Sequence, residues 1–224
     1  MRYILALLLF FQVSVLCAQK NPYGLNIINS PQAYRASIKA HPEKALVDIK
    51  KAVPGVVLDI RYATKNNFMK QVMYPSARAF ARKPVVEQLK KIQAELKKKG
   101  YGLKIFDAYR PYTITVAFYQ KASDKNFVAH PKSGSKHNRG CAVDLSIIDL
   151  KTGKDVPMPT PYDSFSKAAA ADYQDLPPAI KKNRDFLIGV MEKHGFRVMY
   201  NEWWHYDFRG WEKYELMDIP FEKL

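Results

Sequence analysis

The segment SKHNRGCAVDLSII, residues 135–148, joins a polar loop to an apolar run. The run from 142 to 148 is interrupted only by Asp144 and Ser146, and this pattern predicts a β-strand. Because side chains alternate along a strand, its larger apolar residues can enter a core while Asp144 lies on the opposite face. Aspartate is disfavoured within strands. We therefore expect either a salt bridge or a metal ion to compensate its charge.

The segments on either side predict a mixed architecture. Apolar residues at helical spacing predict helices over 84–99 and 178–193, and a further helix is expected over 111–121. Strands are expected over 56–62 and 103–107, and a polar loop over 123–138. Residues 196–200 and 203–208 are expected to form a strand pair or one bent strand. The predicted fold class is α+β, with a small central antiparallel sheet flanked by helices.

A second group of polar residues lies near the C-terminus, in the segment EWWHYD, residues 202–207. Glu202 and His205 are three positions apart, so a regular strand would direct them to opposite faces. If both serve one site, the backbone must bend between them. The two adjacent tryptophans could exclude water from such a site.

Together, His137, Asp144 and His205 offer three nitrogen and oxygen ligands. Three protein ligands with an open fourth position are typical of catalytic zinc, whereas structural zinc usually has four. A neighbouring carboxylate such as Glu202 can accept the proton of water and pass it to a leaving amine. On spacing alone, unrelated buried histidines remain the alternative interpretation.

The two motifs, Ser135-x-His137-x-x-Gly140-x-Ala142-x-Asp144 and Glu202-x-Trp204-His205, resemble those of the VanX-type D-alanyl-D-alanine dipeptidases. Residues 59–68, 107–111 and 201–206 also resemble that family, so the similarity runs from about residue 55 to 210. These enzymes belong to a wider group of zinc D,D-peptidases that includes the VanY-type carboxypeptidases. The resemblance implies the zinc D,D-peptidase (hedgehog/VanX-like) fold.

The resemblance also implies roles for individual residues. His137, Asp144 and His205 would bind one Zn²⁺ per subunit, and Glu202 would be the general base. Arg110 would stabilise the developing oxyanion, with Pro111 restricting its backbone to extended geometry. The positions that would hold the ammonium group of the dipeptide are Ser135 and Asp163. For Arg110 the alternative is a surface salt bridge, and for Asp163 an ordinary loop carboxylate.

The implied reaction is hydrolysis of D-alanyl-D-alanine to two D-alanines, in cell-wall turnover or salvage. The alternative is a peptidoglycan D,D-carboxypeptidase or endopeptidase of the VanY type. A non-catalytic zinc-binding module is a third interpretation, which an intact Glu202 and Arg110 disfavour. The loop between Arg110 and His137 is shorter than in the resistance-type dipeptidases, so the mouth of the pocket is expected to differ. Cys141 stands where small residues are usual, and we expect it to be buried.

Residues 1–18 have the pattern of a secretory signal peptide, followed by one catalytic domain over 19–224. Arg2 precedes an apolar run that is too short for a comfortable membrane span, and cleavage is expected after about Ala18. A lipoprotein anchor at Cys17 is the alternative. These features predict an exported protein, periplasmic or secreted, in which no transmembrane segment remains after cleavage. The formal net charge of +15 favours anionic surroundings, but export disfavours nucleic acid as a partner.

Overall fold

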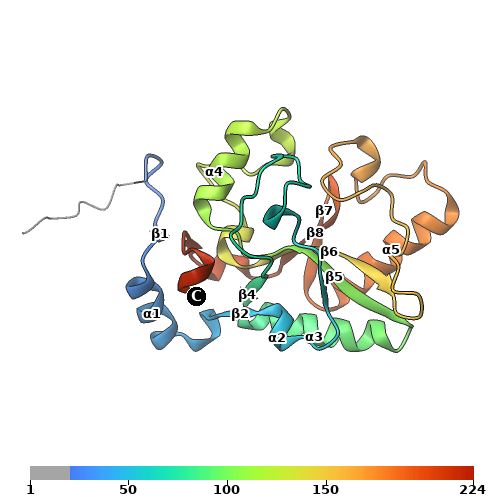
Figure 1. Cartoon of the computed structure of the whole chain (residues 1–224), viewed down its shortest axis with the longest axis horizontal. Coiled ribbons are helices and arrows are strands. Elements are labelled where there is room, and N and C mark those ends of the chain that lie inside the picture. The colour runs from blue at the N-terminus through green and yellow to red at the C-terminus, as the bar shows by residue number, and fades with distance from the viewer. Residues whose placement is uncertain (1–20) are drawn as a thin grey trace, which may run out of the picture.

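A computed structural model describes residues 21–224 and is organised around a five-stranded sheet (Figure 1). The strand order is β3-β5-β6-β8-β7. The strands are β3 (Val57–Leu58), β5 (Tyr101–Asp107), β6 (Ala142–Asp149), β7 (Phe196–Met199) and β8 (Glu202–Phe208). All neighbours pair antiparallel except β3 and β5, which are parallel. The predicted α+β class is confirmed, with one parallel pair at the edge of the sheet.

Two small sheets and five helices complete the described chain. β1 (Ile27–Ile28) pairs with β9 (Leu216–Met217), and β2 (Leu46–Asp48) pairs with β4 (Phe80–Arg82). The helices are α1 (Pro31–Ala40), α2 (Ile49–Ala52), α3 (Lys83–Lys97), α4 (Tyr112–Lys121) and α5 (Pro178–Lys193). In the view of Figure 1, α3 runs below the central strands, α4 stands above them and α5 lies to the side of β7.

Helix α3 shows why the helical predictions were accurate. Proline lies in its first turn, and Gly100, with φ of +81°, ends the segment beyond its last turn. Its buried residues include four that recur at helical spacing and face the core, namely Val85, Leu89, Ile92 and Leu96. Burial of each such side chain contributes roughly 1.5–3 kcal/mol. This helix therefore anchors β5, the strand that leads to Arg110.

Strand β6 lies at the centre of the sheet, between β5 and β8. Val143, Leu145 and Ile147 are fully buried in the core, as the alternation predicted. Asp144 is also buried, at 3% exposure, although it lies on the other face. Its charge therefore has to be compensated within the protein.

The largest departure from the predicted elements is at residues 56–62. Only Val57–Leu58 form a strand, and a 3-10 turn follows over Arg61–Ala63. The turn carries the buried side chain of Tyr62 into contact with Asp163, whereas a continuous strand would have extended past it. Local alternation could not predict this contact between residues that lie 101 positions apart.

The signal-peptide prediction falls on residues 1–18, outside the described part of the chain. Between residues 21 and 224, no helix combines the length and the apolar character needed to cross a bilayer.

Candidate active site

The sheet register brings the distant predicted ligands together. Asp144 on β6 is paired with His205 on β8 and with Asp107 on β5. His137 lies in a 3-10 turn, His137–Arg139, immediately before β6. One side-chain ligand atom from each of His137, Asp144 and His205 lies within 4.8 Å of the other two. The three predicted metal ligands therefore converge.

Gly140 closes the turn that carries His137 and has a φ of +68°. A Cβ atom at this position would lie 2.6 Å from Cδ2 of Leu46, which is closer than such atoms approach. Glycine therefore suits the left-handed backbone of this turn, and any larger residue would also have to displace the Leu46 side chain.

The predicted bend between Glu202 and His205 is present. Two consecutive residues of β7 pair with residues of β8 that are four positions apart. Val198 pairs with Tyr206, and Met199 pairs with Glu202. Residues 203–205 consequently lie outside the β7 pairing, in an irregularity that changes the direction of side chains. This places Oε2 of Glu202 3.8 Å from Nδ1 of His205.

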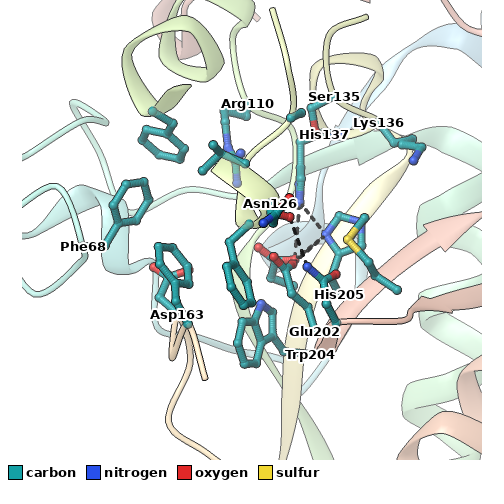
Figure 2. A pocket seen from close by; sticks show the side chains of 18 of the residues that line it. Phe68, Arg110, Asn126, Ser135, Lys136, His137, Asp163, Glu202, Trp204 and His205 are labelled. Carbon is teal, nitrogen blue, oxygen red and sulfur yellow. Dashed lines mark hydrogen bonds and ion pairs between the residues drawn. The ribbon is translucent and has the colours of Figure 1, made fainter. Parts of the chain in front are cut away.

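Each imidazole is oriented by a partner on its far side. Nδ1 of His137 donates to the carbonyl of Ala108 at 2.7 Å, and Nε2 of His205 donates to Oδ1 of Asp207 at 2.8 Å. In the tautomers selected by these contacts, Nε2 of His137 and Nδ1 of His205 carry lone pairs. These two nitrogens lie 3.2 Å apart. Figure 2 shows the two rings facing each other in the pocket.

The third lone pair comes from Asp144. Its Oδ1 lies 3.3 Å from Nε2 of His137 and 3.0 Å from Nδ1 of His205. This oxygen is buried and accepts no hydrogen bond, whereas Oδ2 accepts one from Tyr162 at 2.9 Å. These three buried atoms thus converge from different parts of the chain. A bound cation satisfies all three, and this donor set suits zinc.

Glu202 lies beside this cluster and is 8% exposed. Burial raises the pKa of its carboxyl to about 7. Trp204 follows on the strand and lines the same pocket. A carboxyl with this pKa can both accept and release a proton near neutral pH.

Arg110 is buried and is held by Asp107 rather than by a surface partner. Its Nε and a terminal nitrogen donate to Oδ2 of Asp107 at 3.0 and 2.7 Å. Oδ1 of Asp107 accepts from the hydroxyl of Tyr74 and from the amide of Ala108, each at 2.8 Å. One carboxylate therefore fixes both the guanidinium and the backbone amide of Ala108, the residue whose carbonyl orients His137. Asp107 was not predicted as a site residue, although it lies in the segment that resembles the family.

Ser135 is also buried, and its Oγ accepts a hydrogen bond from the amide of His137 at 3.2 Å. Asp163 faces the pocket from a different loop and has a φ of +60°. The hydroxyl of Tyr62 donates to this carboxyl at 2.9 Å. Burial, and then the negative charge of Asp144, raise the pKa of Asp163 well above its usual range. A bound cation would relieve both effects.

The predicted residues surround one cavity of ≈ 290 Å³. Figure 2 shows Asp163 and Phe68 on one side of it, with Glu202 and His205 on the other. Two loops contribute Phe127 and Phe165 to its lining, and these two rings stack with centroids 4.7 Å apart. Phe127, Phe165 and Tyr62 were not among the predicted site residues, because their roles depend on contacts between distant loops.

A buried cluster of two histidines and an aspartate that opens to a pocket beside a carboxyl group is the arrangement of a mononuclear metallopeptidase. Residues 42–217 match the model of the D-ala-D-ala dipeptidase family, Peptidase M15. The chain belongs to this family, and the enzyme class expected from the sequence is confirmed.

Individual relatives agree with the family match. The D-alanyl-D-alanine dipeptidase of Escherichia coli (strain K12) is 30% identical over 176 residues, which are 79% of this chain and 91% of the relative. That of Enterococcus faecium is 31% identical, over 70% of this chain and 88% of the relative. That of Enterococcus faecalis (strain ATCC 700802 / V583) is 29% identical, over 80% of this chain and 95% of the relative.

Proposed function

We propose that this chain is a zinc-dependent dipeptidase that hydrolyses D-alanyl-D-alanine to two molecules of D-alanine. The observation that carries the proposal is the set of three buried lone pairs on His137, Asp144 and His205, with Glu202 beside them. The relatives at about 30% identity are named for this dipeptide, which supports the choice of substrate.

In this proposal His137, Asp144 and His205 hold one Zn²⁺ per subunit. The ion supplies a Lewis acid that polarises the peptide carbonyl and makes water more acidic. The second-sphere contacts of both histidines support this assignment, because metal-bound imidazoles characteristically donate their other N–H to a carbonyl or a carboxylate.

Glu202 and Arg110 have separate roles in the proposed reaction. Glu202 accepts the proton of the attacking water and delivers it to the amine that leaves. Burial makes this carboxyl a stronger base than an exposed glutamate. Arg110 provides positive charge for the carbonyl oxygen as that oxygen becomes negative. Asp107 holds the guanidinium in place, so no reorganisation is needed during the reaction.

Asp163 distinguishes a dipeptidase from a carboxypeptidase in this proposal. A free dipeptide carries an ammonium group at its N-terminus, whereas the penultimate residue of a wall peptide does not. The buried carboxyl of Asp163 lines the pocket, and an ammonium group beside it would stabilise its ionised form; the free dipeptide supplies that group. Ser135 lines the same pocket and offers a hydroxyl group for the same end of the dipeptide.

The test uses purified protein beginning at Gln19, loaded with one equivalent of zinc. D-Alanine release is measured from D-alanyl-D-alanine and from N-acetyl-D-alanyl-D-alanine. We expect kcat/KM to favour the free dipeptide strongly. A preference for the acetylated substrate would replace the proposal with the VanY-type carboxypeptidase, and hydrolysis of neither would refute both.

We also propose that the protein is exported and acts in D-alanine salvage from cell-wall turnover. The support is the signal-peptide pattern of residues 1–18. Cell fractionation and the intact mass of the mature protein test this part. Retention of residues 1–18 on a cytoplasmic protein would refute it.

A further inference from the structure

The two histidines of the cluster do not present the same nitrogen. His137 directs Nε2 toward Asp144, whereas His205 directs Nδ1, the nitrogen closer to the backbone. The ring of His205 must therefore be held in a particular rotation with its Nε2–H pointing away from the cluster. The group that receives this N–H is the carboxylate of Asp207, at 2.8 Å.

Asp207 is suited to this contact by its place on β8. It is two residues from His205, so the strand directs both side chains to the same face. Its side chain is only 16% exposed, which limits competition from water for the hydrogen bond. By contrast, His137 is oriented by the neutral carbonyl of Ala108. Hydrogen bonds to ionised acceptors are roughly twice as strong as neutral ones.

The second oxygen of Asp207 is also engaged. The Nζ atom of Lys136 lies 3.3 Å from Oδ2 of Asp207, and it also lies 5.5 Å from the ring centre of Trp211. Lys136 immediately precedes His137 in the loop that supplies this ligand. In Figure 2 its side chain extends away from the side of the pocket that holds Asp163. The ion pair thus connects the loop of one predicted ligand with the strand of another.

We propose that Asp207 is a positioning residue that fixes His205 for metal binding through Nδ1, and that Lys136 holds Asp207 in that orientation. The inference rests on the proposed zinc site. Without the carboxylate, the ring of His205 can rotate or exchange its proton between nitrogens. Proton exchange would direct an N–H toward His137 and Asp144 in place of the lone pair, and a flip of the ring would direct a C–H. Metal affinity would fall although all three ligands were still present.

The experiment measures the zinc dissociation constant by competition with a chromophoric chelator. Loss of an outer partner of this kind costs about 10- to 100-fold in metal affinity, and we expect that loss for Asp207→Ala. Asp207→Asn keeps an oxygen that can accept the N–H but removes the charge, so its affinity should fall between those of Asp207→Ala and wild type. Lys136→Met should give a smaller loss than Asp207→Ala.

The matched control is Asp155→Ala. Asp155 also forms an ion pair with a lysine, Lys104, at 2.9 Å, but its side chain is 60% exposed and remote from the cluster. This variant should bind zinc with wild-type affinity. Wild-type affinity for Asp207→Ala, or an equal loss for Asp155→Ala, would overturn the proposal. An unchanged affinity for Lys136→Met would remove Lys136 from it.

A second measurement does not depend on any variant folding. In zinc-loaded wild-type protein, ¹⁵N NMR of the histidine rings should show a proton on Nε2 of His205 and none on Nδ1. The opposite pattern would refute the inference even if zinc binds. Failure of the wild-type protein to bind zinc or hydrolyse D-alanyl-D-alanine would instead refute the proposed function.

Discussion

The substitution Asp163→Asn tests how the substrate is recognised. Asparagine has almost the same shape as aspartate and also tolerates the left-handed backbone that Asp163 adopts, with φ of +60°. Its side-chain oxygen can still accept the hydrogen bond from Tyr62. The variant therefore removes the group that can become negatively charged beside an ammonium group, and leaves the pocket otherwise intact.

The expected loss follows from the burial of this group. A hydrogen bond to a charged partner contributes about 1.5–3 kcal/mol, which corresponds to roughly 10- to 150-fold in kcat/KM. The ammonium group is bound in the ground state and in the transition state alike. The loss should therefore appear mainly as a higher KM, with kcat little changed.

The assay compares free and N-acetylated D-alanyl-D-alanine in wild type and variant. The acetylated substrate lacks the ammonium group, so the variant should leave its low rate unchanged and the preference for the free dipeptide should shrink. The control Asp175→Asn changes an exposed carboxylate between Asp163 and α5 and should have no effect. An unchanged KM for the free dipeptide, or an equal loss for both substrates, would refute the assignment of Asp163.

Three other outcomes follow from the same geometry. Glu202→Ala should retain zinc while kcat falls by about 10²- to 10⁴-fold, the usual contribution of a general base; full activity in steady-state assays would exclude Glu202 from that role. Zinc at 100 times its dissociation constant should stabilise the protein by about 2.7 kcal/mol, or roughly 5–11 °C in Tm by calorimetry, and an identical Tm with chelator would contradict a zinc site. Gly153→Ala should lower the free energy of unfolding by roughly 1–2 kcal/mol, because alanine is strained in its left-handed backbone. Gly140→Ala should lower it more in denaturant unfolding, because its Cβ would also lie 2.6 Å from Leu46. Equal losses would mean that this contact relaxes freely.

The burial of Cys141 agrees with the expectation from the sequence. The residue is fully buried and lies directly before β6. Burial raises the pKa of its thiol to about 12, so the reactive thiolate is scarce at neutral pH. This fits a small buried side chain beside the site, not a ligand.

Several features of this protein could be predicted from the sequence because they depend on near neighbours. Helical spacing and proline and glycine positions predicted α3 and α5 to within a few residues. Two-residue alternation placed Val143 in the core and Asp144 on the opposite face. The motifs predicted which residues form the cluster, because only a few residue types can bind a metal ion.

The tertiary structure alone decided how those residues meet. His137 and His205 are 68 positions apart, and their approach depends on the register between β6 and β8 and on the irregularity in β8. Which ring nitrogen faces Asp144 depends on Ala108 and Asp207, since the partner on the far side of an imidazole selects its tautomer. The turn at Tyr62 and the contact between Phe127 and Phe165 arise in the same way. Local patterns reflect interactions over a few residues, whereas these contacts form only when the whole sheet has assembled.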